Sequence, residues 1–191
     1  YNDRHAGADG KAARGTGRDM LNIQTGRLII RPPVSSDFET FWSMSNDAEV
    51  KRFTGGVTPL SREKYQAQHE QDCRTFDASN AGNCVFSVEE KHTARCIGYC
   101  GFEYSARLGG IELAYGFEKS AWGQGFASEA AEAVLLYGFE ALRLDAVIAA
   151  VNPENVASER ILIKIGMRKT GQIPWPGQGL VSRYEIRRPG S

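Results

Sequence analysis

The 191-residue sequence has little that would anchor it in a membrane. No apolar run exceeds six residues, whereas a helix that spans a bilayer needs about 20. The N-terminal residues contain no apolar signal region. We therefore expect a cytoplasmic protein without a membrane partner.

An excess of charge is also missing. Lysine plus arginine and aspartate plus glutamate number 23 each, which gives a formal net charge of zero. No field from the whole protein would then concentrate nucleic acid at its surface, so we expect no direct nucleic-acid partner. Any anion that the protein binds must be held by a local group of donors.

Metal-binding patterns are absent as well. The sequence has four cysteines without a CxxC pair and three scattered histidines, so we predict no metal site. Cys96 and Cys100 would share one face of a strand, where a redox pair is the alternative to two small buried side chains. In a protein without secretory features we expect free thiols.

Glycine is the one residue type in excess, at 21 of 191. Residues 1–22 contain four glycines and no apolar periodicity, which predicts a flexible N-terminal arm. Residues 23–188 suit a single domain with one core.

Hydrophobic periodicity predicts an α+β domain with a mostly antiparallel mixed sheet flanked by helices. A strand–helix–strand crossover lies in its middle. Ser36 and Glu39 have the spacing of a capping box, and His69 lies on a polar helix that we expect at the surface. The expected helices are 36–46, 61–77, 123–143 and 155–165. The expected strands are 27–31, 84–91, 95–104, 110–118, 145–151, 167–172 and 183–187.

The most informative segment is a glycine-rich turn at 122–130, WGQGFASEA, between a strand and the longest helix. Such a turn presents unpaired backbone N–H groups at the positive end of the helix dipole, which suits a phosphate group. Gly123 and Gly125 would let the anion approach closely. The spacing differs from the common nucleotide-binding motifs, and a turn needed only for chain geometry is the alternative.

Several segments in order, namely this strand and turn, 152–158 (NPENVAS) and 165–168 (IGMR), resemble the GNAT superfamily of acetyl-CoA-dependent N-acyltransferases. The resemblance runs from about Leu28 to Arg187. It is closest to the branch that contains bacterial ribosomal-protein N-terminal acetyltransferases. It implies the GNAT fold, acetyl-CoA as cosubstrate, and a splay between strands 112–117 and 145–151 that holds coenzyme A.

The same resemblance implies the residues that hold coenzyme A. The pantetheine arm would pair with the backbone of the first strand, and Asn152 and Asn155 would offer it their amides. The alternative is that Asn155 only caps a helix and Asn152 only starts a turn. The pantetheine residues are Ala114, Tyr115 and Gly116, and the pyrophosphate residues are Gln124, Gly125, Phe126, Ala127 and Ser128.

Glu112 is our candidate for the catalytic base. Strand alternation places it on the face opposite the apolar residues around it, although a structural carboxylate is the alternative. Many superfamily members use a tyrosine of the following helix as the acid, but residues 158–165 contain none. This departure leaves Ser158, Tyr115 or solvent as the proton donor, and we choose Ser158.

The resemblance implies acetyl transfer to a primary amine by direct attack. We predict a protein or peptide N-terminus as acceptor, because an α-amino group with a pKa of about 7.7–8.0 needs only a modest base. The acceptor site is expected from helices within 36–78 and the loop 173–179, with Trp175 as a wall. Alternatives are a small-molecule amine acetyltransferase (aminoglycoside, polyamine or amino acid) and a non-catalytic acyl-CoA-binding module. We expect a monomer or homodimer.

Overall fold

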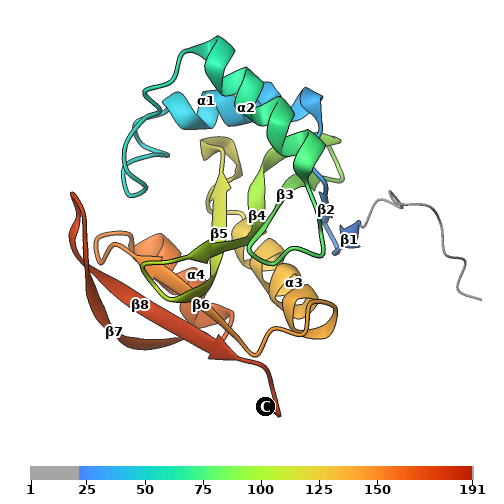
Figure 1. The fold of residues 1–191 in the computed structure, drawn as a ribbon. Coiled ribbons are helices and arrows are strands. Elements are labelled where there is room, and N and C mark those ends of the chain that lie inside the picture. Colours follow the sequence, from blue (N-terminus) through green and yellow to red (C-terminus); the bar gives the residue numbers. More distant parts are fainter. Residues whose placement is uncertain (1–21, 191) are drawn as a thin grey trace, which may run out of the picture.

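The computed structural model describes residues 22–190, so the arm predicted at 1–22 lies outside the described residues but for its last position. Within the described part, one mixed sheet has the order β1-β2-β3-β4-β5-β6-β8-β7 (Figure 1). The β5–β6 pair is parallel and every other pair is antiparallel. The strands are β1 (Ile23–Gln24), β2 (Leu28–Arg31), β3 (Asn83–Glu90), β4 (Arg95–Ser105), β5 (Gly110–Phe117), β6 (Ala146–Val151), β7 (Arg168–Trp175) and β8 (Gly179–Arg187).

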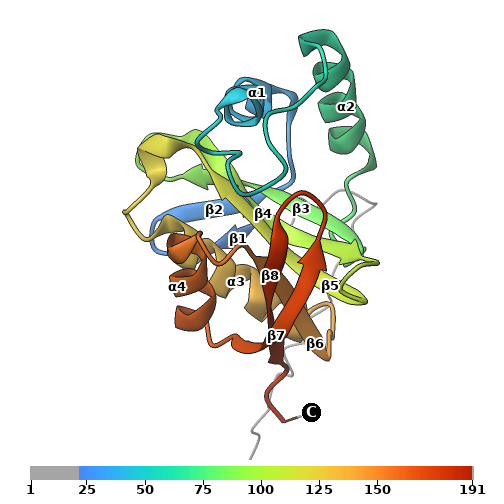
Figure 2. The ribbon, with the colours of Figure 1, turned by 90° about the vertical axis from the view of Figure 1, so that its left-hand side faces the viewer.

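The helices form two layers on opposite faces of the sheet (Figures 1 and 2). Phe102 of β4 packs so closely on α3 that a Cβ at Gly138 would come within 2.6 Å of its ring. Tyr99 of the same strand faces the other way and contacts Phe41 of α1. The helices are α1 (Phe38–Asn46), α2 (Arg62–Thr75), α3 (Phe126–Glu140) and α4 (Val156–Lys164). The predicted fold class is confirmed.

The main core lies between the sheet and the α3–α4 layer. It contains large side chains from β3, β4 and β5, the inner face of α3, and β6 and β8. Because alternate residues of each strand enter this core, the other residues of β4 and β5 face the α1–α2 layer. No helix among residues 22–190 combines the length and apolar character needed to cross a membrane.

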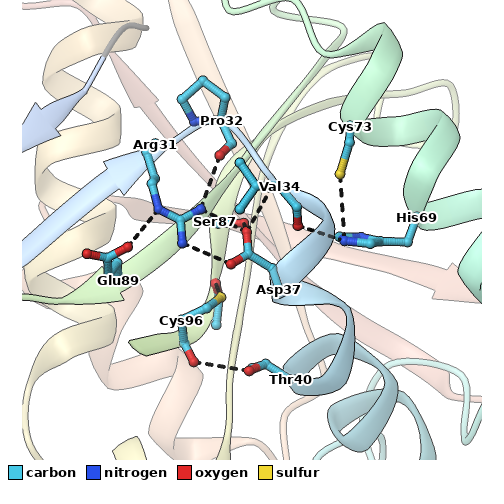
Figure 3. Close-up of polar contacts among 11 residues, drawn as sticks. Arg31, Pro32, Val34, Asp37, Thr40, His69, Cys73, Ser87, Glu89 and Cys96 are labelled. Carbon is cyan, nitrogen blue, oxygen red and sulfur yellow. Dashed lines mark hydrogen bonds and ion pairs between the residues drawn. The ribbon is translucent and has the colours of Figure 1, made fainter. Parts of the chain in front are cut away.

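Asp37, rather than the predicted Ser36–Glu39 capping box, organises the chain before α1 (Figure 3). A short 3-10 turn, η1 (Ser35–Asp37), precedes α1, and the Asp37 carboxylate accepts the Val34 N–H at 3.0 Å. It also accepts two hydrogen bonds from the Arg31 guanidinium, at 2.8 and 2.9 Å, and one from the Ser87 hydroxyl at 2.6 Å. The capping-box prediction was wrong. Ser36 lies within η1, and the buried Asp37 accepts the backbone N–H there and joins β2 and β3 to η1.

His69 is likewise buried, which corrects the prediction that it lies at the surface. Only 6% of it is exposed, its Nε2 lies 3.0 Å from the Val34 carbonyl oxygen, and its ring contacts those of Phe38 and Phe41. The polar helix α2 therefore packs Tyr65 and His69 against the aromatic residues of α1. The polar composition of α2 did not reveal this buried face.

Candidate active site

A cleft of about 1160 Å³ lies where β5 and β6 separate, and residues from both faces of the sheet line it. Within the described chain, the parallel ladder between these strands has one residue pair, Glu112 opposite Ile148. The residues of β5 beyond this pair line the cleft, together with the N-terminal ends of α3 and α4. On the other face of the sheet its walls are α1, α2 and the loop between them. One opening thus connects both faces.

The N-terminus of α3 is where the sequence predicts an anion site. Gly125 is the N-cap and lies in the left-handed region with φ +81°, and Gly123 has φ +72°. No side chain caps the helix, so the N–H groups of its first turn are left without an intrahelical or capping partner. A Cβ at Gly123 would meet no atom within 4 Å, which leaves the turn open. These donors at the positive helix end fit the pyrophosphate of coenzyme A.

The structure brings most of the predicted cofactor residues together, with Gln124 as the exception. Its side-chain amide donates to the Ser120 carbonyl oxygen at 2.7 Å, and its own carbonyl accepts from Arg27 at 2.8 Å. Gln124 does not line the cleft, and its contact with the cofactor stays a prediction. The lining contains Ala114, Tyr115, Gly116, Gly125, Phe126, Ala127, Ser128, Asn152 and Asn155.

Tyr115 and Ser158, two of the candidate proton donors, form one hydroxyl pair. Their hydroxyl oxygens are 2.7 Å apart, and the Tyr115 hydroxyl also lies 3.3 Å from the Ser158 carbonyl oxygen. Burial raises the pKa of the Tyr115 hydroxyl, although the bond to Ser158 offsets part of this. Tyr115 therefore stays protonated, and its hydroxyl and that of Ser158 lie together in the cleft lining.

Glu112 lies on the opposite face, half-buried and paired in register with Glu103 of β4. Burial raises the pKa of the Glu112 carboxyl, hydrogen bonds from Ser105 and Ala150 offset part of this, and the charge of Glu103 adds to it. Desolvation and the charge of Asp72 on α2 raise the pKa of Glu103 as well. All three carboxyl groups line the cleft, and so do Lys51 and Arg52 of the loop between α1 and α2.

Both asparagines use an oxygen locally, as their structural alternatives predicted. Asn155 caps α4 by accepting the Ser158 N–H at 3.2 Å. Asn152 accepts the Glu154 N–H at 2.9 Å, and its amide nitrogen donates to Gln178 at 3.4 Å. Since both also line the cleft, a cap and a cofactor contact are compatible for Asn155.

Tyr99 is a cleft residue that the sequence did not identify as part of the site. Its ring lies directly over Gly116, where a Cβ would come within 2.7–2.9 Å of the ring atoms and hydroxyl. Burial raises the pKa of Tyr99 to about 12. The usable signal was the register of two strands, which places Tyr99 opposite Gly116 but is not visible in either strand alone.

Trp175 is not in the cleft lining, contrary to the expected acceptor wall. Its ring packs instead under the Arg107 guanidinium at 5.4 Å.

The four cysteines are free, and burial raises the pKa of Cys84 and Cys96 to about 12. Among residues 22–190, no group of three or more histidine, cysteine, aspartate or glutamate residues could hold a metal ion.

Comparison with known proteins gives matches over most of the chain. A family model described as an acetyltransferase (GNAT) domain matches residues 27–168. The uncharacterized N-acetyltransferase p20 of Bacillus licheniformis is 31% identical over 153 residues, which cover 80% of this chain and 85% of that protein.

Two solved structures show how far the architecture is shared. A GNAT-family acetyltransferase from Bacillus anthracis is 28% identical with a TM-score of 0.72, covering 88% of this chain and 99% of that one. RimL, described as a ribosomal L7/L12 α-N-protein acetyltransferase in complex with coenzyme A, has a TM-score of 0.75 at 14% identity, covering 90% and 100%. This second likeness concerns the fold alone.

Proposed function

The chain belongs to the GNAT acetyltransferase family and is an acetyl-CoA-dependent N-acetyltransferase, and we propose that it acetylates the α-amino group at a protein or peptide N-terminus. The observation that supports this proposal is the single cleft that connects the two faces of the sheet. One side offers the anion-binding turn of α3, and the other offers carboxylates to a cationic amine.

Residues of α3, β5 and α4 would each bind a different part of coenzyme A. The N–H groups at the start of α3 would hold the pyrophosphate, and the free backbone of β5 from Ala114 to Gly116 would pair with the pantetheine. The amide nitrogen of Asn155 is available to donate at the start of α4. Acetyl-CoA supplies the activated acyl group as a thioester.

Proton transfer would use both faces of β5. Glu112 would take a proton from the acceptor's ammonium, so that the neutral amine forms the new N–C bond. As the C–S bond breaks, the Tyr115–Ser158 hydroxyl pair would give a proton to the leaving sulfur. The new amide nitrogen loses its second proton to solvent, from which the pair recovers its own. In this proposal the Tyr115–Ser158 pair, in which burial keeps Tyr115 protonated, is the proton donor on one face of β5, and Glu112 is the base on the other.

The chemistry of this base favours an α-amine. An α-amino group has a pKa of about 7.7–8.0, so a carboxylate of somewhat raised pKa can deprotonate it near neutral pH. A lysine amine with a pKa of about 10.4 is only about 0.1% neutral under these conditions and demands a stronger base. The shared fold with a ribosomal-protein N-terminal acetyltransferase is consistent with this choice.

A small cationic amine is the second candidate, supported by a specific observation. Asp72, Glu103 and Glu112 converge on the acceptor side of the cleft. Such a group of carboxylates would also suit a polyamine or an aminoglycoside, which carry several positive charges.

A mass-resolved acetyl transfer assay separates the two candidates. The purified protein is given acetyl-CoA with N-terminal peptides, the same peptides with a blocked N-terminus, amino acids, polyamines and aminoglycosides. We expect the highest kcat/KM with a free peptide N-terminus and none with its blocked form. Preference for any small amine over every peptide contradicts the proposed acceptor.

A further inference from the structure

Arg27 connects the start of the chain's sheet to the anion-binding turn about 100 residues later. It lies in the β1–β2 turn, and its Nη1 donates to the Gln124 carbonyl oxygen at 2.8 Å. Its Nε donates to the Glu129 carboxylate at 2.7 Å, and its guanidinium lies 4.5 Å from the centre of the Phe126 ring. One side chain therefore contacts residues before and after the N-cap Gly125.

Glu129 places a negative charge in the first turn of α3, next to the proposed anion site. Burial would raise the pKa of its carboxyl, but hydrogen bonds from Thr25 and Arg27 and the Arg27 charge outweigh burial and lower the pKa. Thr25 Oγ1 donates to it at 2.5 Å, and the Arg27 backbone N–H at 2.9 Å. The carboxylate is thus ionised and would repel a pyrophosphate unless Arg27 neutralised it.

We propose that Arg27 is a positioning residue for coenzyme A, which it serves by fixing the Gly123–Phe126 turn and neutralising Glu129. The inference rests on the proposed cofactor site at the start of α3. Arg27 acts through this turn, because its donors are directed to Gln124 and Glu129. A guanidinium is required for both tasks, since an ammonium cannot bridge a carboxylate and a carbonyl in the same planar geometry.

The location of Arg27 separates positioning from folding. Its side chain is 50% exposed and β1 beside it has only two residues, and the core residue that it covers is Phe126. Glu129 is 20% exposed, and an ion pair near the surface contributes at most about 1 kcal/mol to stability. We therefore expect Arg27→Ala to lower the Tm by no more than about 2–4 °C.

The test measures coenzyme A binding by calorimetry and steady-state kinetics with both substrates. We expect Arg27→Ala to raise the Kd of coenzyme A and the KM of acetyl-CoA about tenfold, with kcat and the acceptor KM unchanged. For Arg27→Lys, the Kd of coenzyme A and the KM of acetyl-CoA should fall between those of the wild type and those of Arg27→Ala. The matched control is Arg95→Ala, which removes an exposed arginine that pairs with Glu118 outside the cleft lining and should leave every constant as in the wild type.

A double variant tests the electrostatic part. With Glu129→Gln already present, Arg27→Ala should weaken coenzyme A binding by clearly less than tenfold, because no carboxylate remains to be neutralised. An unchanged Kd in Arg27→Ala overturns the inference, and so do parallel losses of acceptor affinity and Tm. If the wild-type protein binds no coenzyme A, the proposed cofactor site fails instead, so the two failures are distinguishable.

Discussion

At the scale of single residues, Glu112 sets the expected pH dependence of catalysis. Its raised carboxyl pKa means that the base form becomes available at a higher pH than for an ordinary glutamate, so kcat/KM should rise through this pKa. We expect Glu112→Gln to lower kcat/KM roughly 100-fold, the lower end for a general base, since an α-amine is already partly neutral near pH 7.5. The rising acidic limb of the pH–rate profile should then move to the pKa of the acceptor's own α-amino group, about 7.7–8.0.

Thermal unfolding supplies the control for this variant. A glutamate whose pKa is raised by folding stabilises the fold only while it is protonated, and that contribution is lost as the pH rises. Glu112→Gln should therefore be at least as stable as the wild type at pH 8. A variant that folds normally and keeps full turnover from pH 6 to 9 removes Glu112 from the mechanism.

Alternation along one strand was sufficient to predict the face on which Glu112 lies. It could not predict which residues of the neighbouring strand contact this site. The period of two puts it opposite the core-facing Leu113 and Phe117, and the structure agrees. The contact of Tyr99 with Gly116 depends on how two strands are aligned. Such contacts between distant residues carry no local sequence pattern, so a single sequence could not reveal them.

At the scale of an element, the start of α3 depends on a glycine conformation. Gly125 has φ +81°, a region that costs an L-residue about 1–2 kcal/mol, and a Cβ there would lie 3.5 Å from Arg27 Nη2. We expect Gly125→Val to abolish coenzyme A binding, because the new side chain distorts the turn and covers its N–H donors. Calorimetric titration with coenzyme A measures the loss.

Gly177→Val is the matched control, since Gly177 has φ +72° in the β7–β8 turn, outside the cleft lining. Both variants should lose similar stability, but only Gly125→Val should lose the cofactor. Unchanged coenzyme A affinity in Gly125→Val would assign the glycine-rich turn a purely structural role.

Periodicity predicted the elements better than their ends and surroundings. The 3.6-residue pattern located α3, observed as Phe126–Glu140 within the predicted 123–143, because its apolar face is continuous. The start of α1 was assigned to Ser36, whereas Asp37 accepts the local N–H group because Arg31 and Ser87 hold it in place. Choosing between adjacent polar residues requires knowing which one is buried.

At the scale of the whole molecule, the buried ion pair between Arg31 and Asp37 attaches the α1–α2 layer to the sheet. Asp37 is 2% exposed and joins β2 and β3 to η1 directly before α1 (Figure 3). Arg31 also pairs with Glu89 at 2.8 Å. Without the Asp37 carboxylate, only Glu89 would remain to balance the partly buried charge of Arg31. We expect Asp37→Asn to lower the free energy of unfolding by about 3–5 kcal/mol at pH 7, measured by urea denaturation.

The pH dependence identifies the source of this loss. Burial would raise the pKa of Asp37, but hydrogen bonds from Arg31, Ser87 and Val34 outweigh it and lower the pKa. A lowered pKa stabilises the fold above the unfolded value of about 3.9, and this stabilisation is lost as the pH falls toward the folded value. The difference between wild type and Asp37→Asn should therefore shrink below pH 4. Asp145→Asn, at an exposed pair with Arg188, should change little at any pH, and a constant difference from pH 7 to 3 would contradict the ion-pair explanation.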